Sequence, residues 1–213
     1  MGLVLFIANK RYSSWSMRPW VLLKALGVPF EERLQAFAPG HRQPAFLSFS
    51  PTGKVPALVD GDVTVWDSLA IVEYIAEAHP AAWPRDRAAR AFARCAAAEM
   101  HAGFEAVRDQ CSMNVALRVD LGRPPDAALQ RDLDRLDRLS PPPTRSSRPV
   151  ATRVRTFGLR LSGPATAYVE TLLGHPAVKQ WVEEGVAETM REPSHEADAL
   201  RGREVLQDLS QPR

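Results

Sequence analysis

The feature that most constrains the fold is a change of hydrophobic pattern close to residue 80. Before it, short apolar runs alternate with stretches of helical periodicity; after residue 86, helical patterns take over and no strand-like alternation recurs. The chain has 213 residues, a length that suits one large domain or two small ones. We therefore expect an α/β domain over residues 1–80, an all-helical domain over 86–192 and a polar, mobile tail over 193–213.

The first eighty residues predict a small mixed sheet with helices. The expected elements are a buried strand at 3–8, a helix at 16–28, a second strand at 29–37, a loop with a short helix at 39–54, a hairpin at 55–67 and a helix at 68–80. This order is a thioredoxin-like arrangement. In the second domain, helical patterns cover 85–116, 126–139, 164–173 and 176–191.

Composition excludes several classes of protein. The chain is 45% hydrophobic and 24% charged, and its net charge of +2 is too small to indicate a nucleic-acid or membrane partner. No apolar run approaches a membrane span, and the N-terminus lacks signal-peptide features. Cys95 and Cys111 lack the CxxC spacing, so we expect free core thiols and a cytoplasmic protein. The histidines show no metal-binding spacing, so no metal is expected at His41, His79, His101, His175 or His195.

The segment "GKVPAL" places a proline at the start of an expected central strand. Proline is normally excluded from such a position because it cannot donate a ladder hydrogen bond. A cis Val55–Pro56 bond would resolve this and leave the backbone of Val55 free to pair with an extended peptide. The alternative is that Pro56 begins an edge strand.

The segment "WDSLAI" places Asp67 and Ser68 at a strand-to-helix junction. Ser68 is expected to cap the helix. The free N–H groups of the first turn could also bind a carboxylate, and Asp67 could pair with an adjacent ammonium. A ligand with an α-amino acid head group would satisfy both.

Three serines stand where the first expected helix begins, in "RYSSWSMRPW". Ser16 as N-cap would place Pro19 at the third helical position, where its missing N–H costs nothing. One serine suffices for capping, so Ser13 and Ser14 remain for another purpose. Hydroxyls at a helix N-terminus can donate to an anion, and a thiolate held there would have its pKa lowered from about 8.5. No cysteine of the chain lies here, so the thiol would come from a ligand. A peptide thiol with an α-amino acid end describes glutathione.

These three segments together resemble the N-terminal domain of cytosolic glutathione transferases. "YSSWSMRPW" is similar to the serine motif of the zeta class, "GKVPAL" to the family's cis-proline segment and "DSLAIVEYI" to its Glu/Asp-Ser-x-Ala-Ile helix. In the second half, "AAEMHAGFEAVRDQCSMN" and the region 151–181 also look like bacterial members. The resemblance implies a thioredoxin-like domain followed by an all-α domain, with glutathione as co-substrate.

The resemblance assigns roles to individual residues. Ser13 matches the family's catalytic serine, with Ser14 as the second choice. Val55, beside Pro56, would pair its backbone with the cysteinyl part of glutathione, and Asp67 and Ser68 would hold the γ-glutamyl end. Lys54 could meet the glycine carboxylate; the alternative is an ordinary exposed lysine. Four residues are candidates for the pocket of the second substrate: Trp15, Met100, Phe104 and Arg108, although Met100 and Phe104 could instead be core residues.

Two features depart from the family pattern. Zeta enzymes carry a cysteine where this chain has Trp15, which argues against zeta-type isomerase chemistry. Residues 140–150, "SPPPTRSSRPV", are atypical: the Ser-x-x-Asp capping box of a buried helix is absent, and the prolines cannot form that helix. We interpret this stretch as a possible frame slip accompanied by a deletion.

The sequence therefore predicts a glutathione transferase that activates the thiolate for attack on a small hydrophobic electrophile. Such alkyl and aryl transfer is typical of detoxification, and the resemblance also implies a homodimer. Two alternatives remain: a glutathione-dependent cis–trans isomerase of the maleylacetoacetate type, and a non-catalytic glutathione-binding module on the same fold.

Overall fold

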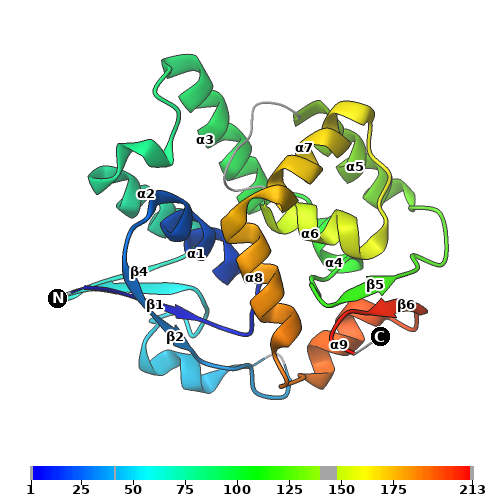
Figure 1. Ribbon diagram of the computed structural model, residues 1–213, viewed down its shortest axis with the longest axis horizontal. Helices are drawn as coiled ribbons and strands as arrows, with labels where there is room; N and C mark the ends of the chain where they lie inside the picture. The colour runs from blue at the N-terminus through cyan, green and yellow to red at the C-terminus, as the bar shows by residue number, and fades with distance from the viewer. Residues whose placement is uncertain (1, 41, 140–147, 212–213) are drawn as a thin grey trace.

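The computed structural model describes residues 2–40, 42–139 and 148–211. Its N-terminal domain contains a four-stranded sheet in the order β2-β1-β3-β4 (Figure 1). The strands are β1 (Leu3–Ile7), β2 (Phe30–Leu34), β3 (Ala57–Asp60) and β4 (Val63–Trp66). Strand β2 runs parallel to β1, whereas β3 is antiparallel to both β1 and β4. This arrangement confirms the expected thioredoxin-like sheet.

The two helices of this domain are capped by residues earlier in the chain than expected. Helix α1 spans Ser14–Leu26 because Ser13, rather than Ser16, is its N-cap, so Pro19 lies inside the helix instead of in its first turn. Helix α2 spans Ser68–Ala78, and Asp67 rather than Ser68 caps it, since the Asp67 side chain accepts a hydrogen bond from Leu69 N. The short 3₁₀ helix η1 spans Pro44–Ser48, and η2, Pro80–Ala82, follows α2.

Side chains along β1 point alternately to the two faces of the sheet, and they pack in the core on both faces. Leu5 and Ile7 are fully buried in a cluster shared with α1, whereas Phe6 faces the other way and stacks on Phe49, just after η1, with ring centroids 4.3 Å apart. The same cluster continues into the second domain, where the rings of Trp20 and Trp181 lie 5.3 Å apart. One hydrophobic cluster therefore spans both domains, while a second cluster lies within the helical domain.

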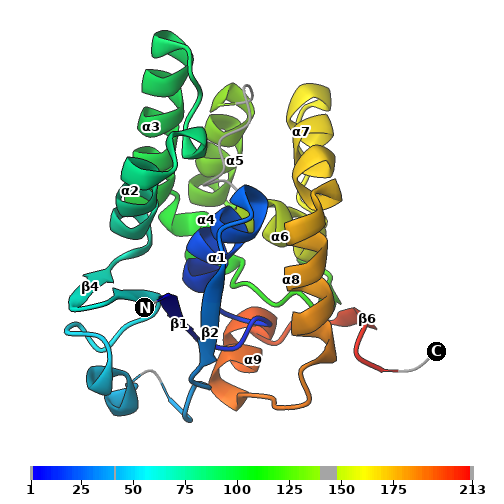
Figure 2. The same cartoon turned by 60° about the vertical axis from the view of Figure 1, so that its left-hand side comes forward.

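The second domain consists mainly of helices, several of which stand side by side in Figure 2. Their bounds are α3 (Arg87–Ala102), α4 (Glu105–Gln110), α5 (Ala127–Leu139), α6 (Arg148–Phe157), α7 (Gly163–Gly174) and α8 (Pro176–Ala187). The expected helix over 85–116 is wrong as a single element. It breaks at Gly103, and Phe104 has a positive φ of 59°. No helix within the described ranges is both long and apolar enough to cross a bilayer.

The C-terminal residues expected as a mobile tail contain regular structure. Helix α9 spans Pro193–Leu200, and β6 (Val205–Asp208) pairs antiparallel with β5 (Leu117–Val119), a strand that the sequence pattern did not predict. Polar contacts hold this segment to the rest of the chain: Tyr12 Oη donates to Glu196 at 2.6 Å, and Arg191 pairs with Asp208. The polar side chains of this segment therefore bind residues that are distant in sequence, and composition alone cannot reveal such contacts.

Helix α6 forms although the sequence lacks the expected capping box. Tertiary contacts hold it instead: the buried Arg153 donates to the carbonyl of Cys111 at 2.6 Å, and Thr156 Oγ1 donates to the carbonyl of Asn114 at 2.9 Å. Residues 140–147, which carry most of the proposed frame slip, lie outside the described residues.

The two cysteines differ in environment. Cys111 is fully buried in the helical core, and burial raises the pKa of its thiol to about 11. Cys95 is exposed on α3, so the expectation that both thiols are core residues is wrong for Cys95.

Helix α8 docks its C-terminal end onto the loop after β1. The Glu188 carboxylate accepts hydrogen bonds from the backbone N–H groups of Lys10 (2.7 Å) and Arg11 (3.2 Å), while Arg11 Nη2 donates to the carbonyls of Val186 and Glu188. Gly185 permits this approach, because a Cβ there would lie 2.8 Å from Val115 Cγ2 and 3.0 Å from the carbonyl carbon of Lys10.

We predict that Gly185→Ala lowers the free energy of unfolding by about 1–3 kcal/mol, the usual cost of overpacking, because backbone must move to admit the methyl group. Gly174→Ala is the matched control, since a Cβ at the end of α7 meets nothing within 4 Å. Chemical denaturation of the two variants measures the difference. Equal stability of both variants would show that the α8 contact is not closely packed.

Candidate functional site

The expected site residues meet at one end of the sheet. Strand β1 ends at Ile7 and leads to α1, while the register pairs Phe6 with Ala57, the first residue of β3. Ala57 also pairs with Trp66, the last residue of β4. Three segments therefore lie at the same end of the sheet: residues 8–14, the Val55–Pro56 segment and Asp67.

The serines at the start of α1 are buried and hydrogen-bonded. Ser13 Oγ lies 2.7 Å from Ser16 Oγ and accepts from Ser16 N, while Ser16 Oγ accepts from Ala8 N at 3.3 Å. Within the Ser13–Ser16 pair, the Ser13 hydroxyl donates to Ser16 Oγ. Ser14 Oγ accepts from Arg153 Nη2 at 3.0 Å.

Three guanidinium groups gather near this helix N-terminus. The pKa of Arg18 is lowered to about 9, chiefly by burial and also by the positive charges of Arg108 and Arg153, whereas Asp67 opposes the shift. Burial also lowers the pKa of Arg153 to about 10. Among the described residues, none of these three arginines forms an ion pair with a carboxylate. The local charge is therefore positive and suited to an anion.

The ring of Trp15 contacts two of these cations. The guanidinium carbons of Arg18 and Arg108 lie 4.1 Å and 4.8 Å from the centroid of its ring. The ring of His101 meets it edge-on at 5.3 Å, and His101 Nε2 lies 3.4 Å from Asp67 Oδ2. The structure thus connects Trp15 on α1 to the N-terminus of α2 through a histidine of α3.

Asp67 and Ser68 lie where an α-amino acid group would meet the end of α2. Asp67 is exposed and has a positive φ of 73°, which costs backbone strain in a non-glycine residue and is typical of functional sites. Its Oδ1 accepts from Leu69 N at 2.8 Å, and Ser68 Oγ accepts from Arg18 Nη1 at 3.4 Å. One carboxylate thus stands beside hydroxyl, guanidinium and backbone donors.

The proline segment has the expected geometry. The Val55–Pro56 peptide bond is cis, and Val55 lies outside the sheet ladder because β3 begins at Ala57. Pro56 is buried, whereas Lys54 is exposed.

The candidate residues of the second-substrate pocket separate into two groups. Trp15 and Arg108 come together, and the carbonyl of Met100 accepts hydrogen bonds from Arg18 and Arg108. The side chains of Met100 and Phe104 instead lie in the core of the helical domain. The structure therefore places Trp15 and Arg108, but not Phe104, beside the serines.

Sequence reasoning missed three contributors to this site. Arg18 was noticed only as part of a motif, and His101 was set aside with the other histidines. Arg153 lies 139 positions from its partner Ser14, so no local signal could have found it. Within the described residues, no group of three His, Cys, Asp or Glu side chains could hold a metal ion.

The comparisons with known proteins agree with this geometry. Residues 12–78 match the family model for the glutathione S-transferase N-terminal domain. Glutathione S-transferase F13 of Arabidopsis thaliana is 58% identical over 43 residues, 20% of either chain, and glutathione S-transferase F9 of the same plant is 41% identical over 68 residues, 32% of either chain. The aligned segments thus span about a fifth to a third of these relatives.

Similarity of structure extends over almost the whole chain. A crystal structure of a glutathione transferase homologue from Burkholderia, with bound glutathione, superposes with a TM-score of 0.64 at 23% identity, covering 87% of this chain and 98% of the other. At this identity the match establishes the fold. Residues 12–78 therefore match the N-terminal domain of glutathione S-transferases, and the chain as a whole has the fold of these proteins.

Proposed function

We propose that the protein is a glutathione transferase. It would hold glutathione at the end of the sheet where the site residues meet and activate its thiolate for attack on a small hydrophobic electrophile. The observation that carries this proposal is the arrangement of two buried serine hydroxyls and three guanidinium groups at the N-terminus of α1. The named relatives and the glutathione-bound Burkholderia structure support it.

The charge distribution supports activation of a thiol. A thiolate near Ser13 would accept the Ser13 hydroxyl hydrogen, which in the structure is donated to Ser16, and it would also face the positive end of α1. Arg153 donates to Ser14 and so orients the second hydroxyl. Because the local guanidiniums lack paired carboxylates, an anion relieves their mutual repulsion and its conjugate acid loses its proton more readily.

The rest of glutathione would bind to the other candidate residues at this end of the sheet. The backbone of Val55 would pair with the cysteinyl unit, and Asp67 with Ser68 would hold the γ-glutamyl ammonium and carboxylate. Lys54, exposed beside Val55, would meet the glycine carboxylate.

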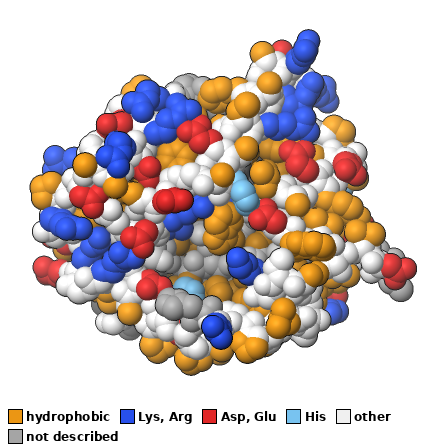
Figure 3. Space-filling model, turned by 180° about the vertical axis from the view of Figure 1, so that it is seen from behind, with side chains coloured by type: hydrophobic (Ala, Val, Ile, Leu, Met, Phe, Trp, Pro, Cys, Tyr) orange, Lys and Arg blue, Asp and Glu red, His pale blue; other side chains and the backbone are white. Residues whose placement is uncertain are grey.

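An electrophile would lie against Trp15 and Arg108, facing the helical domain. Figure 3 shows a depression near the centre of the face opposite to that of Figure 1, with hydrophobic side chains in it and a histidine and acidic groups beside it. We propose that this depression accepts the apolar body of the electrophile.

An isomerase and a binding module remain the competing functions. Retention on glutathione resin with turnover of an aryl halide supports the transferase. Retention without either aryl-halide turnover or isomerisation of maleylacetoacetate would indicate a binding module, and isomerisation alone would indicate the isomerase.

Two further expectations belong to this proposal, a homodimer and a cytoplasmic location. Val63 and Trp66 on the edge strand β4 are 47% and 45% exposed, and such apolar groups favour association with a second copy. Sedimentation of the purified protein tests the dimer; a monomer at all concentrations contradicts it.

We predict that Ser13→Ala lowers kcat/KM for transfer about 10²-fold, as removal of one donor to an oxyanion does, while retention on glutathione resin persists. Steady-state kinetics measures this effect, and a raised apparent pKa in the pH–rate profile is expected with it. Unchanged rates in Ser13→Ala together with a loss in Ser14→Ala would move the role to Ser14.

The control for lost capping is Asp86→Ala. Asp86 caps α3 by accepting a hydrogen bond from Ala89 N at 2.7 Å. Its replacement therefore removes a helix cap, as Ser13→Ala does, but leaves the serines unchanged. Both variants should lose comparable stability, but only Ser13→Ala should lose activity.

We predict that Asp67→Asn raises KM for glutathione about tenfold while kcat changes little, because asparagine still caps α2 but no longer pairs with the ammonium of the γ-glutamyl group. Initial rates over a range of glutathione concentrations measure this split. An unchanged KM would remove Asp67 from the binding site.

A further inference from the structure

The three guanidinium groups near the N-terminus of α1 have different partners. Arg153 donates to Ser14 Oγ at 3.0 Å, beside the position proposed for the thiolate. Arg18 is buried, and its Nη1 donates to Ser68 Oγ at 3.4 Å, beside the position proposed for the γ-glutamyl carboxylate. Each of these two arginines therefore lies next to a serine that would hold one negative group of glutathione.

Arg108 has no such position relative to glutathione. It belongs to α4, and its Nη2 donates to the carbonyls of Met100 and His101 at the end of α3. Its Nε and Nη1 have no hydrogen-bond partner among the described residues, and the side chain is only half-buried. Two nitrogen atoms of this guanidinium are therefore free to donate to a ligand.

No carboxylate of the described residues forms an ion pair with Arg108. Burial lowers the pKa of Arg108, and the charges of Glu105 and Asp132 oppose this shift from beyond ion-pair distance. Asp132 Oδ2 already accepts a hydrogen bond from Val107 N at 3.1 Å. The residues outside the described ranges include no Asp or Glu. The positive charge of Arg108 is therefore left without a counter-charge from an acidic side chain.

Trp15 holds Arg108 close to the proposed reaction centre. The guanidinium carbon of Arg108 lies 4.8 Å from the centroid of the Trp15 ring, and this contact restricts the long side chain. Trp15 directly follows Ser14 in the chain, so a group bound by Arg108 would lie near the thiolate. The guanidinium is thus positioned for the second substrate.

We propose that the electrophile carries a carboxylate and that Arg108 binds this group through Nε and Nη1. This inference rests on the proposed function and specifies its second substrate as an acid with an apolar body. The carboxylate oxygens supply the acceptors that Arg108 lacks, and hydrogen bonds between charged groups are stronger than those between neutral ones. The electrophile would then be the third anionic group at the site, after the thiolate beside Arg153 and the γ-glutamyl carboxylate beside Arg18.

Arg108 would determine specificity without taking part in the bond changes. When the acceptor is an aryl chloride, the thiolate sulfur forms a bond to the ring carbon, and chloride leaves with the electron pair of the carbon–chlorine bond. The carboxylate is unchanged, and its contact with Arg108 orients the ring toward the sulfur.

Steady-state kinetics with two matched aryl chlorides tests the proposal. One is the chloronitrobenzoate with the nitro group ortho and the carboxylate para to the chlorine, and the other is the corresponding uncharged benzamide. Each kcat/KM is divided by the rate constant of the uncatalysed reaction with glutathione, because the two rings differ in reactivity. We expect the wild-type protein to favour the benzoate about tenfold or more on this scale.

Two substitutions of Arg108 test its role. Arg108→Met should reduce the preference for the benzoate to about one, whereas Arg108→Lys, which keeps the charge, should retain part of it. The preference is a ratio measured within one variant, so it is independent of any loss of folded protein or of glutathione affinity. This matters because Arg108 also donates to the end of α3.

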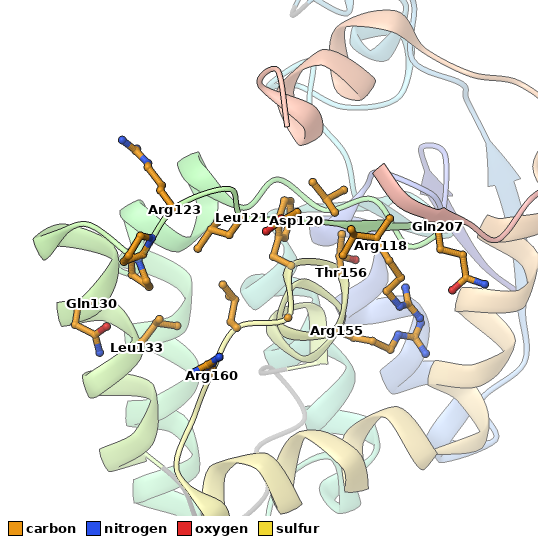
Figure 4. Close-up of a pocket in the computed structure, with 17 residues that line it drawn as sticks. Arg118, Asp120, Leu121, Arg123, Gln130, Leu133, Arg155, Thr156, Arg160 and Gln207 are labelled. Carbon is orange, nitrogen blue, oxygen red and sulfur yellow. The ribbon is translucent and has the colours of Figure 1, made fainter. Parts of the chain in front are cut away.

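Arg118→Met is the matched control. Arg118 is another half-buried arginine of the helical domain, but it lines a separate cavity formed by β5, β6, α5 and the end of α6 (Figure 4). Its removal should leave the preference for the benzoate at the wild-type value.

The outcomes separate this inference from the proposed function. Equal normalised turnover of both compounds by the wild-type protein, or a preference for the benzamide, would overturn the inference and leave the transferase function in place. A preference for the benzoate that persists in Arg108→Met would overturn it as well. Turnover of neither compound, by a protein that glutathione resin retains, would overturn the transferase function and this inference with it.

Discussion

The structure depends on the contact between the loop after β1 and the C-terminal end of α8. Lys10 and Arg11 give their backbone N–H groups to Glu188, and Arg11 in turn donates to the last carbonyls of α8. This exchange satisfies groups that the end of a helix leaves unpaired. It also fixes the chain just before Ser13, so the direction of α1 and the position of its N-terminus follow from the interface between the two domains.

The same interface gathers positive charge where the proposed thiolate would lie. Burying Arg18 and Arg153 without carboxylate partners costs stability, and the pKa of each guanidinium falls accordingly. A bound anion would offset part of this cost. The affinity for glutathione and the activation of its thiol would therefore have the same electrostatic source. On this proposal, the second domain would contribute to the glutathione site through Arg153 and would also form a wall for the electrophile.

Sequence reasoning recovered what is encoded locally. The order of strands and helices in the N-terminal domain follows from hydrophobic spacing and turn chemistry. Ser13, Val55 and Asp67 have site roles that the resemblance implies and that stay predictions; the structure shows that each lies at the boundary of a helix or strand.

Long-range partners could not be predicted in the same way. Helix α9 and strand β6 are polar, and they are ordered by contacts with residues far away in sequence, such as Tyr12 with Glu196. Helix α6 lacks its capping box but forms through buried hydrogen bonds to the 111–114 loop. Identifying these features requires the tertiary structure, because no window of the sequence contains both partners.

The account's central claim is that the N-terminus of α1 keeps a ligand thiol anionic. Titration of the thiolate absorbance of bound glutathione measures this most directly. We predict an apparent pKa at least about one unit below the ordinary thiol value of about 8.5. A bound thiol that titrates at the same pH as free glutathione would contradict the account.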